Sequence, residues 1–191
     1  AHAEGSITLN GRPFDDPREA GIAHVPEDRQ HLGVIMDFTA WENMAFGYHR
    51  HFAKGALMDN KTLRSETAEV MERFDVRPLL PDLAIKNFSG GNQQKIVVAR
   101  EIERNPDLLL IGQPTRGVDI GAIEFIHKQI VALRDQGKAI LLVSVELDEI
   151  MSLSDRIAVM CGGRIVGTRD PATTNEKELG LLMAGVNDEA A

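Results

Sequence analysis

Beyond residue 92, short apolar runs alternate with longer amphipathic stretches. Strands are predicted over the apolar runs 107–111, 139–144, 156–160 and 164–168. Helices are predicted over 92–104, over the stretch that carries Ile123, Ile126, Ile130 and Leu133 on one stripe, over 146–153 and over 176–184. Asn175, with Glu178 three positions later, has the pattern of a capping box that starts the last helix. This alternation predicts an α/β fold with a largely parallel sheet that helices cover on both faces.

The first half of the chain has a different pattern. Residues 6–14 alternate apolar and polar around an Asn-Gly pair, which predicts a β-hairpin, and residues 22–26 predict a short strand. Residues 32–80 are mostly helical in pattern and contain no convincing strand. One apolar face within them carries Leu63, Val70, Met71 and Phe74. We therefore expect a mostly helical lobe, with Trp41 as its core anchor.

Length and charge exclude several classes of protein. A chain of 191 residues favours one domain, or one domain with an inserted lobe. Its net charge of −8 and pI near 5.2 argue against a nucleic-acid-binding surface. The single cysteine, Cys161, cannot form an internal disulfide, which suits a reducing compartment. No apolar run approaches the ~20 residues that cross a bilayer, and the first five residues lack a signal-peptide pattern.

The most informative motif is Ser89-Gly90-Gly91, directly before a predicted helix. Such a helix start offers free backbone N–H groups, a hydroxyl and the positive end of the aligned peptide dipoles. Glycines let an anion approach the backbone closely. By itself the motif is most simply a capped helix after a glycine turn, so its surroundings decide between the two interpretations.

These surroundings resemble the nucleotide-binding domain of ABC transporters. Segment 87–95, Asn-Phe-Ser-Gly-Gly-Asn-Gln-Gln-Lys, is similar to the family's signature motif, and 107–119 is similar to its Walker B strand and D-loop. Segment 139–150 resembles the switch strand and its following helix, and 23–29 lies where the Q-loop belongs. The motifs occur in the family's order, and the resemblance covers residues 5–185.

The resemblance implies a P-loop NTPase fold of the ABC ATPase type that lacks its N-terminal P-loop portion and has an inserted helical subdomain. It implies antiparallel strands and the Q-loop segment over 1–31, the helical subdomain over 32–86, and the C-terminal part of the ATPase core over 87–191. The forms of the signature motif and D-loop resemble the second domain of tandem ATPases that drive sugar and nucleoside importers. Segments 121–127 and 145–149 favour the nucleoside branch.

The sequence departs from the family's pattern at the phosphate-binding loop. A P-loop needs G-x-x-x-x-G-K-[S/T], whose backbone amides and lysine hold the phosphates. The single Gly-Lys pair, Gly137-Lys138, is followed by Ala139 and has Ala132 where the first glycine belongs. We therefore expect the first strand, the P-loop and the first helix to lie outside this chain, and the chain alone to be inactive.

The positions that would carry catalytic groups are also altered. The family's Walker B carboxylates, one for magnesium and one for the attacking water, correspond to Gly112 and Gln113. The switch position, often histidine, is Val145, which cannot donate a hydrogen bond to a phosphate. The Q-loop position is Glu27, which is still able to reach a metal-bound water. The resemblance thus implies a degenerate catalytic half-site with no intact catalytic residue, and the six histidines show no metal-ligand spacing with Cys161.

The signature motif is the part that remains. In the resembled family two domains stack head to tail, and each ATP lies between one domain's P-loop and the other's signature motif. This implies that Ser89, Gly90, Gly91 and Gln93 serve a nucleotide held by a companion domain, with Asp119 of the D-loop at the same interface. ATP and Mg²⁺ are then expected mainly at the companion's site.

The resemblance also implies partners and a location. The partners are a companion nucleotide-binding domain and integral-membrane permease subunits, which dock on the helical subdomain, with Phe38, Trp41 and Met44 as a candidate face. The location is the cytoplasmic face of the membrane, with no nucleic acid bound. We expect an ATPase fragment of a nucleoside or sugar importer. The alternatives are an interaction module that binds no nucleotide, and a soluble ABC ATPase.

Overall fold

The computed structural model describes residues 8–9, 11–13, 21–48, 53–54 and 57–186. The chain divides into two units, residues 1–141 and 142–191, and the boundary lies inside the strand Ala139–Val143. The division expected from the sequence, with boundaries after residues 31 and 86, stays a prediction. None of the described helices is long and apolar enough to cross a membrane.

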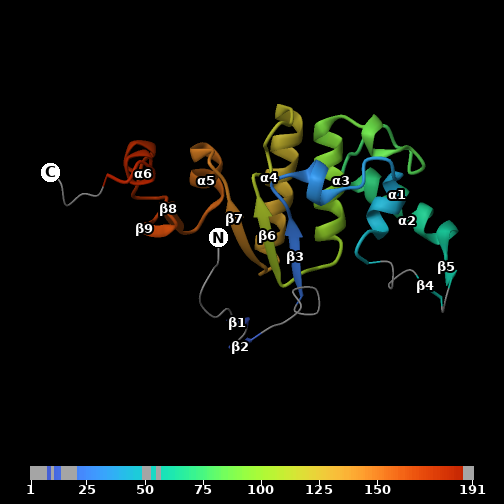
Figure 1. The fold of residues 1–191 in the computed structure, drawn as a ribbon, viewed down its shortest axis with the longest axis horizontal. Coiled ribbons are helices and arrows are strands. Elements are labelled where there is room, and N and C mark those ends of the chain that lie inside the picture. Colours follow the sequence, from blue (N-terminus) through green and yellow to red (C-terminus); the bar gives the residue numbers. More distant parts are fainter. Residues whose placement is uncertain (1–7, 10, 14–20, 49–52, 55–56, 187–191) are drawn as a thin grey trace. The chain divides into compact units, whose positions relative to one another are not determined.

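Three strands form a sheet in the order β3-β6-β7 (Figure 1). β3 (Ile22–Val25) and β6 (Leu108–Gly112) are parallel, with Val25 opposite Ile111, and β7 (Ala139–Val143) follows β6 in the sheet. The apolar runs predicted as strands are therefore confirmed. Val25 and Ile111 are buried because these strands lie inside the first unit.

Helix α3 (Gly90–Ile102) is the central helix of the first unit. It packs against β3, α1 (Ala40–Ala45) and α4 (Ile120–Asp135), and every residue from 93 to 101 is buried. Because five of these nine residues are polar or charged, they need hydrogen-bond partners inside the protein. On α4 the buried stripe consists of Ala122, Ile126, Ile130 and Leu133, so the prediction holds except that Ile123 is only half-buried.

The sequence pattern predicted that helices cover both faces of the sheet. This prediction does not hold along the whole width of the sheet. Along β7, exposed and half-buried residues alternate, and the side chains of Leu141 and Val143 are 56% and 59% exposed. An apolar strand with one open face is unusual for a parallel sheet, whose strands are ordinarily buried on both sides.

The helical lobe contains the predicted amphipathic helix, α2 (Asn60–Arg73). All four residues predicted on its apolar face are buried. Trp41, on α1, packs with Ala45 and Leu63, so its role as a core anchor is confirmed. Its indole N–H donates to Asp82, and the guanidinium of Arg64 lies 4.6 Å from the centre of its ring.

Two features of this lobe differ from expectation. A short antiparallel pair, β4 (Ala53–Lys54) with β5 (Leu57–Met58), lies in a stretch for which no strand was predicted. Phe38 is 43% exposed, but Trp41 and Met44 are buried, so the three do not form one exposed docking face. The spacing i, i+3, i+6 gave no information on which side of α1 faces the core.

At the N-terminal end, the predicted hairpin is present as β1 (Thr8–Leu9) paired antiparallel with β2 (Arg12–Pro13). Gly11, in the turn, has φ +76°, a backbone conformation that glycine adopts without steric cost. Asn10 lies outside the described residues.

The second unit is built on an antiparallel hairpin, β8 (Ile157–Cys161) and β9 (Arg164–Arg169). The two residues between the strands, Gly162 and Gly163, both have positive φ, as a tight two-residue turn requires. Helices α5 (Leu147–Leu153) and α6 (Glu176–Met183) complete the unit. The core of the unit consists of Ile157, Val159, Leu179 and Leu182.

The predicted capping box of α6 is half formed. Asn175 caps the helix by accepting from the backbone N–H of Glu178 at 3.0 Å. The carboxylate of Glu178 does not accept from the backbone N–H of Asn175, as a full capping box requires. It accepts from the Thr174 hydroxyl at 2.7 Å instead and pairs with Arg169. These bonds, that from Thr174 first, hold the pKa of Glu178 below its usual value.

The chain's single tyrosine, Tyr48, gives a test of the packing around α3. Its hydroxyl donates to the buried carboxylate of Glu101 at 2.8 Å, and the guanidinium of Arg104 lies over its ring. Burial, reinforced by the Glu101 charge, raises the pKa of Tyr48 to about 12. The neutral phenol therefore stabilises the fold below pH about 10, and this contribution is lost as pH rises from about 10 towards 12.

We expect the tyrosinate absorbance of the native chain to titrate with a midpoint near pH 12. In denaturant the midpoint should fall to about 10, the value of a free tyrosine. A native midpoint near 10 would show that Tyr48 does not contact Glu101.

Candidate functional site

The start of α3 has the geometry expected of a phosphate-binding helix terminus. Ser89 is the N-cap residue, and its hydroxyl oxygen accepts from the backbone N–H of Asn92 at 3.4 Å and from its side-chain amide at 2.8 Å. The first N–H groups of any helix have no partner within the helix and carry part of the positive end of the dipole. Such a terminus favours an anion, and binding of an anion at Ser89-Gly90-Gly91 stays a prediction.

The two glycines of the motif also have a packing role inside the chain. A Cβ on Gly91 would lie 2.6 Å from Oδ2 of Asp119 and 3.0 Å from Cβ of Ala122. A Cβ on Gly90 would lie 2.7 Å from Nη2 of Arg29 and 3.0 Å from the carbonyl oxygen of Gly117. A Cβ on Gly91 would have to displace the Asp119 carboxylate, and one on Gly90 would have to displace the Arg29 guanidinium, so both glycines allow close packing whether or not an anion binds.

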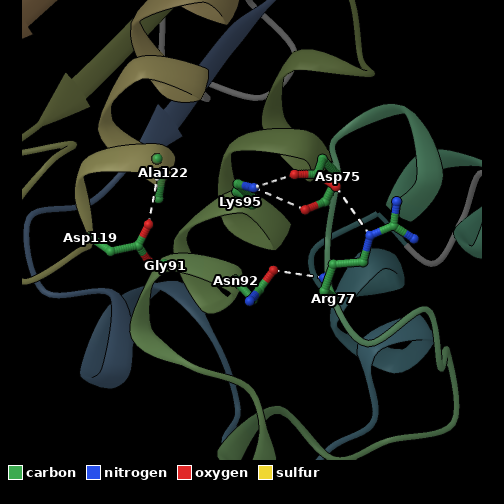
Figure 2. A pocket seen from close by; sticks show the side chains of 8 residues that line it. Asp75, Arg77, Gly91, Asn92, Lys95, Asp119 and Ala122 are labelled. Carbon is green, nitrogen blue, oxygen red and sulfur yellow. Dashed lines mark hydrogen bonds and ion pairs between the residues drawn. The ribbon is translucent and has the colours of Figure 1, made fainter.

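Asp119 joins the starts of two helices. Its Oδ1 caps α4 by accepting from the N–H of Ala122 at 2.9 Å, while Oδ2 faces Gly91 of α3 (Figure 2). The turn that leads to Asp119 follows β6 and carries Gln113 and Arg116. The structure thus brings together the predicted residues of the signature motif and of the D-loop.

A polar pocket of about 220 Å³ lies beside this junction (Figure 2). Its lining includes Asp75, Arg77, Asn92, Lys95 and Asp119. The Lys95 ammonium is largely buried and donates to the backbone carbonyl of Asp75 at 2.9 Å and to its Oδ2 at 3.1 Å. The hydrogen bond from Lys95 to the carboxylate is the main reason that the pKa of Asp75 lies below its usual range.

Gln93, which the sequence placed with the nucleotide-binding residues, does not line this pocket. It is 3% exposed, and its side-chain amide donates to the carbonyl oxygens of Ile85 and Phe88 at 3.2 and 3.0 Å. It therefore holds the turn Ile85–Asn87, which precedes the motif. Asn92 lines the pocket instead, and its Oδ1 accepts from the backbone N–H of Arg77 at 2.7 Å.

Asn92 and Lys95 are the functional candidates that sequence reasoning missed. The helical period contains the signal, since residues 92 and 95 share a face, whereas Gln93 precedes the apolar Ile96 and Val97 by three and four positions and so shares their buried face. No sequence signal places Asp75 or Arg77 beside them.

Two of the degenerate positions, Gly112 and Gln113, lie at the end of β6. A Cβ on Gly112 would lie 3.3 Å from the backbone nitrogen of Glu27, so a side chain there would be tightly packed against that segment. Gln113 has φ +47°, in the left-handed region. The carboxylate of Glu27 pairs with the guanidinium of Arg116 at 2.5 Å. Val145 belongs to the second unit, where it is 60% exposed.

Glu27, Gly112 and Gln113 do not provide the ligands for a magnesium ion bound by this chain. Glycine and glutamine stand where the resembled family has carboxylates, and the carboxylate of Glu27 is paired with an arginine. Within the ranges that the structure describes, no three His, Cys, Asp or Glu side chains lie close enough together to hold a metal ion.

Comparison with known sequences agrees with the motifs. A family model described as "ABC transporter" matches residues 1–116. The nucleoside import ATP-binding protein NupA of Lactococcus lactis is 47% identical over 190 residues, covering 96% of this chain and 38% of the relative. The guanosine import ATP-binding protein NupO of Bacillus subtilis is 45% identical, covering 98% and 38%. The ribose import ATP-binding protein RbsA of Bacillus cereus is 34% identical, covering 95% and 38%.

Solved structures share the fold. A nucleotide-free ATP-binding cassette from an ABC transporter superposes with a TM-score of 0.71 at 21% identity, covering 97% of this chain and 75% of that one. A dimeric cassette bound to ADP and phosphate gives 0.69 at 22% identity, covering 88% and 74%. The α/β fold class predicted from the sequence is thereby confirmed. The chain spans about 38% of the length of the curated relatives described above.

Proposed function

Because the chain belongs to the ABC transporter family, we propose that it is the part of an importer's ATPase that completes the nucleotide site of a companion domain. The observation that carries this proposal is the junction of α3 and α4. There Ser89, Gly90 and Gly91 lie at the start of α3, and the carboxylate of Asp119 faces Gly91. The end of β6, in contrast, offers no carboxylate at Gly112 or Gln113.

The chemistry of this surface is binding and orientation. Free N–H groups at the start of α3 and the Ser89 hydroxyl donate to phosphate oxygens of a nucleotide that the companion domain holds. The Asn92 side chain lies one residue further on and faces the same pocket. Since these donors are fixed before the nucleotide arrives, they stabilise charge in the transition state without reorganising.

This chain's own half-site takes no catalytic part in the proposal. The amide of Gln113 cannot accept a proton as a carboxylate does, and Val145 offers no hydrogen-bond donor. The Glu27 carboxylate is paired with Arg116. Hydrolysis, with its Mg²⁺, therefore belongs to the companion's site, and this chain contributes the surface that closes on it.

The names of the relatives support a proposal for the solute. Two of them are named for nucleoside or guanosine import at 45–47% identity, above the 34% of a ribose importer ATPase, so we propose a nucleoside as the solute. We propose that the helical lobe of α1 and α2 docks on permease subunits at the cytoplasmic face of the membrane. Phe38, 43% exposed just before α1, is the apolar side chain we assign to that contact.

The chain alone should bind MgATP weakly, because its sequence has no phosphate-binding loop pattern and its described residues form no group able to hold a metal ion. Isothermal calorimetry on the isolated chain should give no micromolar dissociation constant. A micromolar constant corresponds to about −8 kcal/mol, which the start of one helix does not supply. Micromolar binding by the chain without a companion domain would contradict the proposed division of labour.

A further inference from the structure

One arginine connects three separate segments at the junction of α3 and α4. Arg29 lies in the single turn Arg29–Gly33 that follows β3, and its Nη1 donates to the carbonyl oxygen of Arg116 at 2.8 Å. Its Nη2 donates to the carbonyl oxygen of Gly117 at 3.3 Å. The same Nη2 lies against Gly90, at 2.7 Å from the position that a Cβ would take there.

Helix electrostatics do not explain this placement. A positive charge beside the first turn of a helix is repelled by the positive end of the dipole. Burial lowers the pKa of Arg29, but an arginine keeps its charge at neutral pH. Its Nε is buried, with no hydrogen-bond partner within the part of the chain that the structure describes. The two bonds to carbonyl oxygens are therefore the interactions that hold the guanidinium against the motif.

The contact is reinforced from both sides. The side chain of Arg116 pairs with Glu27, two residues before Arg29, and so links the same two segments a second time. This exposed ion pair by itself contributes little to stability. At the far end of the same turn, the carbonyl oxygen of Gly33 accepts from Nη1 of the buried Arg100 at 2.9 Å. The segment after β3 is thus tied at one end to the turn before α4 and at the other end to α3.

We propose that Arg29 is a positioning residue, which holds residues 116–117 on Gly90 so that the signature motif and Asp119 reach the companion's nucleotide as one rigid surface. The inference rests on the proposed function, because it assigns the site that this surface serves. Arg29 does not itself touch the nucleotide. Its loss leaves the donors of α3 in place but frees the turn that carries Asp119.

The geometry also sets what a conservative change does. Lysine keeps the charge of Arg29 but has one compact ammonium in place of a planar fork, so it bonds one carbonyl oxygen well and the second poorly. Arg29→Lys is therefore expected to restore part of what Arg29→Ala removes.

The test uses the full-length ATPase reconstituted with its permease in proteoliposomes and measures phosphate release and equilibrium MgATP binding. We expect Arg29→Ala to lower kcat about tenfold, which corresponds to about 1.4 kcal/mol. The Kd for MgATP should stay unchanged, because the companion domain holds the nucleotide. Arg29→Lys should lie between. Arg134→Ala is the matched control, since Arg134 pairs with Asp135 at the other end of α4.

Ser89→Ala separates this inference from the proposed function. If Ser89→Ala lowers kcat while Arg29→Ala behaves like Arg134→Ala, the positioning role is wrong and the proposed function stands. If Ser89→Ala leaves kcat unchanged as well, both are wrong. Equal losses of kcat and of MgATP-binding capacity after Arg29→Ala would show a folding defect and would also overturn the positioning role.

A second measurement uses the short contact with Gly90. In the wild-type chain, the added methyl group of Gly90→Ala displaces the Arg29 guanidinium. In the Arg29→Ala background that guanidinium is gone, and the methyl group meets only the carbonyl oxygen of Gly117. The melting temperature should therefore fall more on Gly90→Ala in the wild-type background than in Arg29→Ala. Equal shifts in the two backgrounds would show that Arg29 does not lie against the motif.

Discussion

Asn92→Asp in the assembled importer should lower ATP hydrolysis about a hundredfold, the cost typical of losing one donor to the transition state. Asparagine and aspartate have the same shape, and the new carboxylate still accepts from the N–H of Arg77. A negative charge in the first turn of α3 stabilises the helix, so the fold is preserved. The same charge repels the phosphate that we propose docks there. Steady-state phosphate release measures the effect, with thermal unfolding as the check on folding.

Asn105→Asp makes the same chemical change at an exposed position just beyond the C-terminal end of α3, and should leave hydrolysis unchanged. Gln113→Ala should also leave it unchanged, because we assign that position no catalytic group. Gly91 is a poorer probe, since any Cβ there conflicts with Asp119 at 2.6 Å. If Asn92→Asp hydrolyses ATP at the wild-type rate, the start of α3 does not face a phosphate.

Arg100→Met should be the most destabilising of the changes considered, at about 3–5 kcal/mol, because it leaves a buried charge without its partner. Arg100 and Glu101 form an ion pair at 2.8 Å, and their side chains are only 5% and 4% exposed. Arg100 also donates to the carbonyl oxygens of Gly33 and Asn43. The loss is a large part of the roughly 5–15 kcal/mol that stabilises an ordinary domain. Denaturant unfolding of the chain measures it.

Arg134→Met provides the comparison on the surface. Arg134 and Asp135 pair at 2.8 Å, but their side chains are 42% and 62% exposed. Such a pair contributes about 0–1 kcal/mol, so the substitution should have little effect. Equal stabilities of the two variants would mean that the Arg100–Glu101 pair is open to water.

The periodicity of apolar residues predicted most strands and helices correctly, because buried positions recur with the period of the helix or strand that carries them. The strands at β3, β6 and β7 were predicted from apolar runs, and α2 from four apolar residues that are all buried. The pattern was less informative where burial depends on distant segments. It did not show that one face of β7 stays open, nor that Trp41 and Met44 point inward while Phe38 does not.

For the candidate site, too, the sequence predicted the local features and not those that depend on distant segments. The placing of Ser89, Gly90 and Gly91 at a helix start is confirmed, because a motif before a helix is local in sequence. The glycines' second role, close packing against Asp119 and Arg29, depends on segments about 30 to 60 residues away and has no local signature. Gln93 belongs to the same motif, but the helical period turns its side chain to the core, where it donates to the carbonyl oxygen of Ile85.

The proposed function requires that this chain's signature motif serves a nucleotide held by another domain. The most direct measurement is photoaffinity labelling with an ATP analogue that carries a reactive group on its γ-phosphate, followed by peptide mapping. The label should appear on peptide 87–95 when the companion domain is present, and should be absent from that peptide when the chain is alone. Labelling of the isolated chain at 87–95, or labelling of the assembled protein at 112–113 instead, would contradict the account.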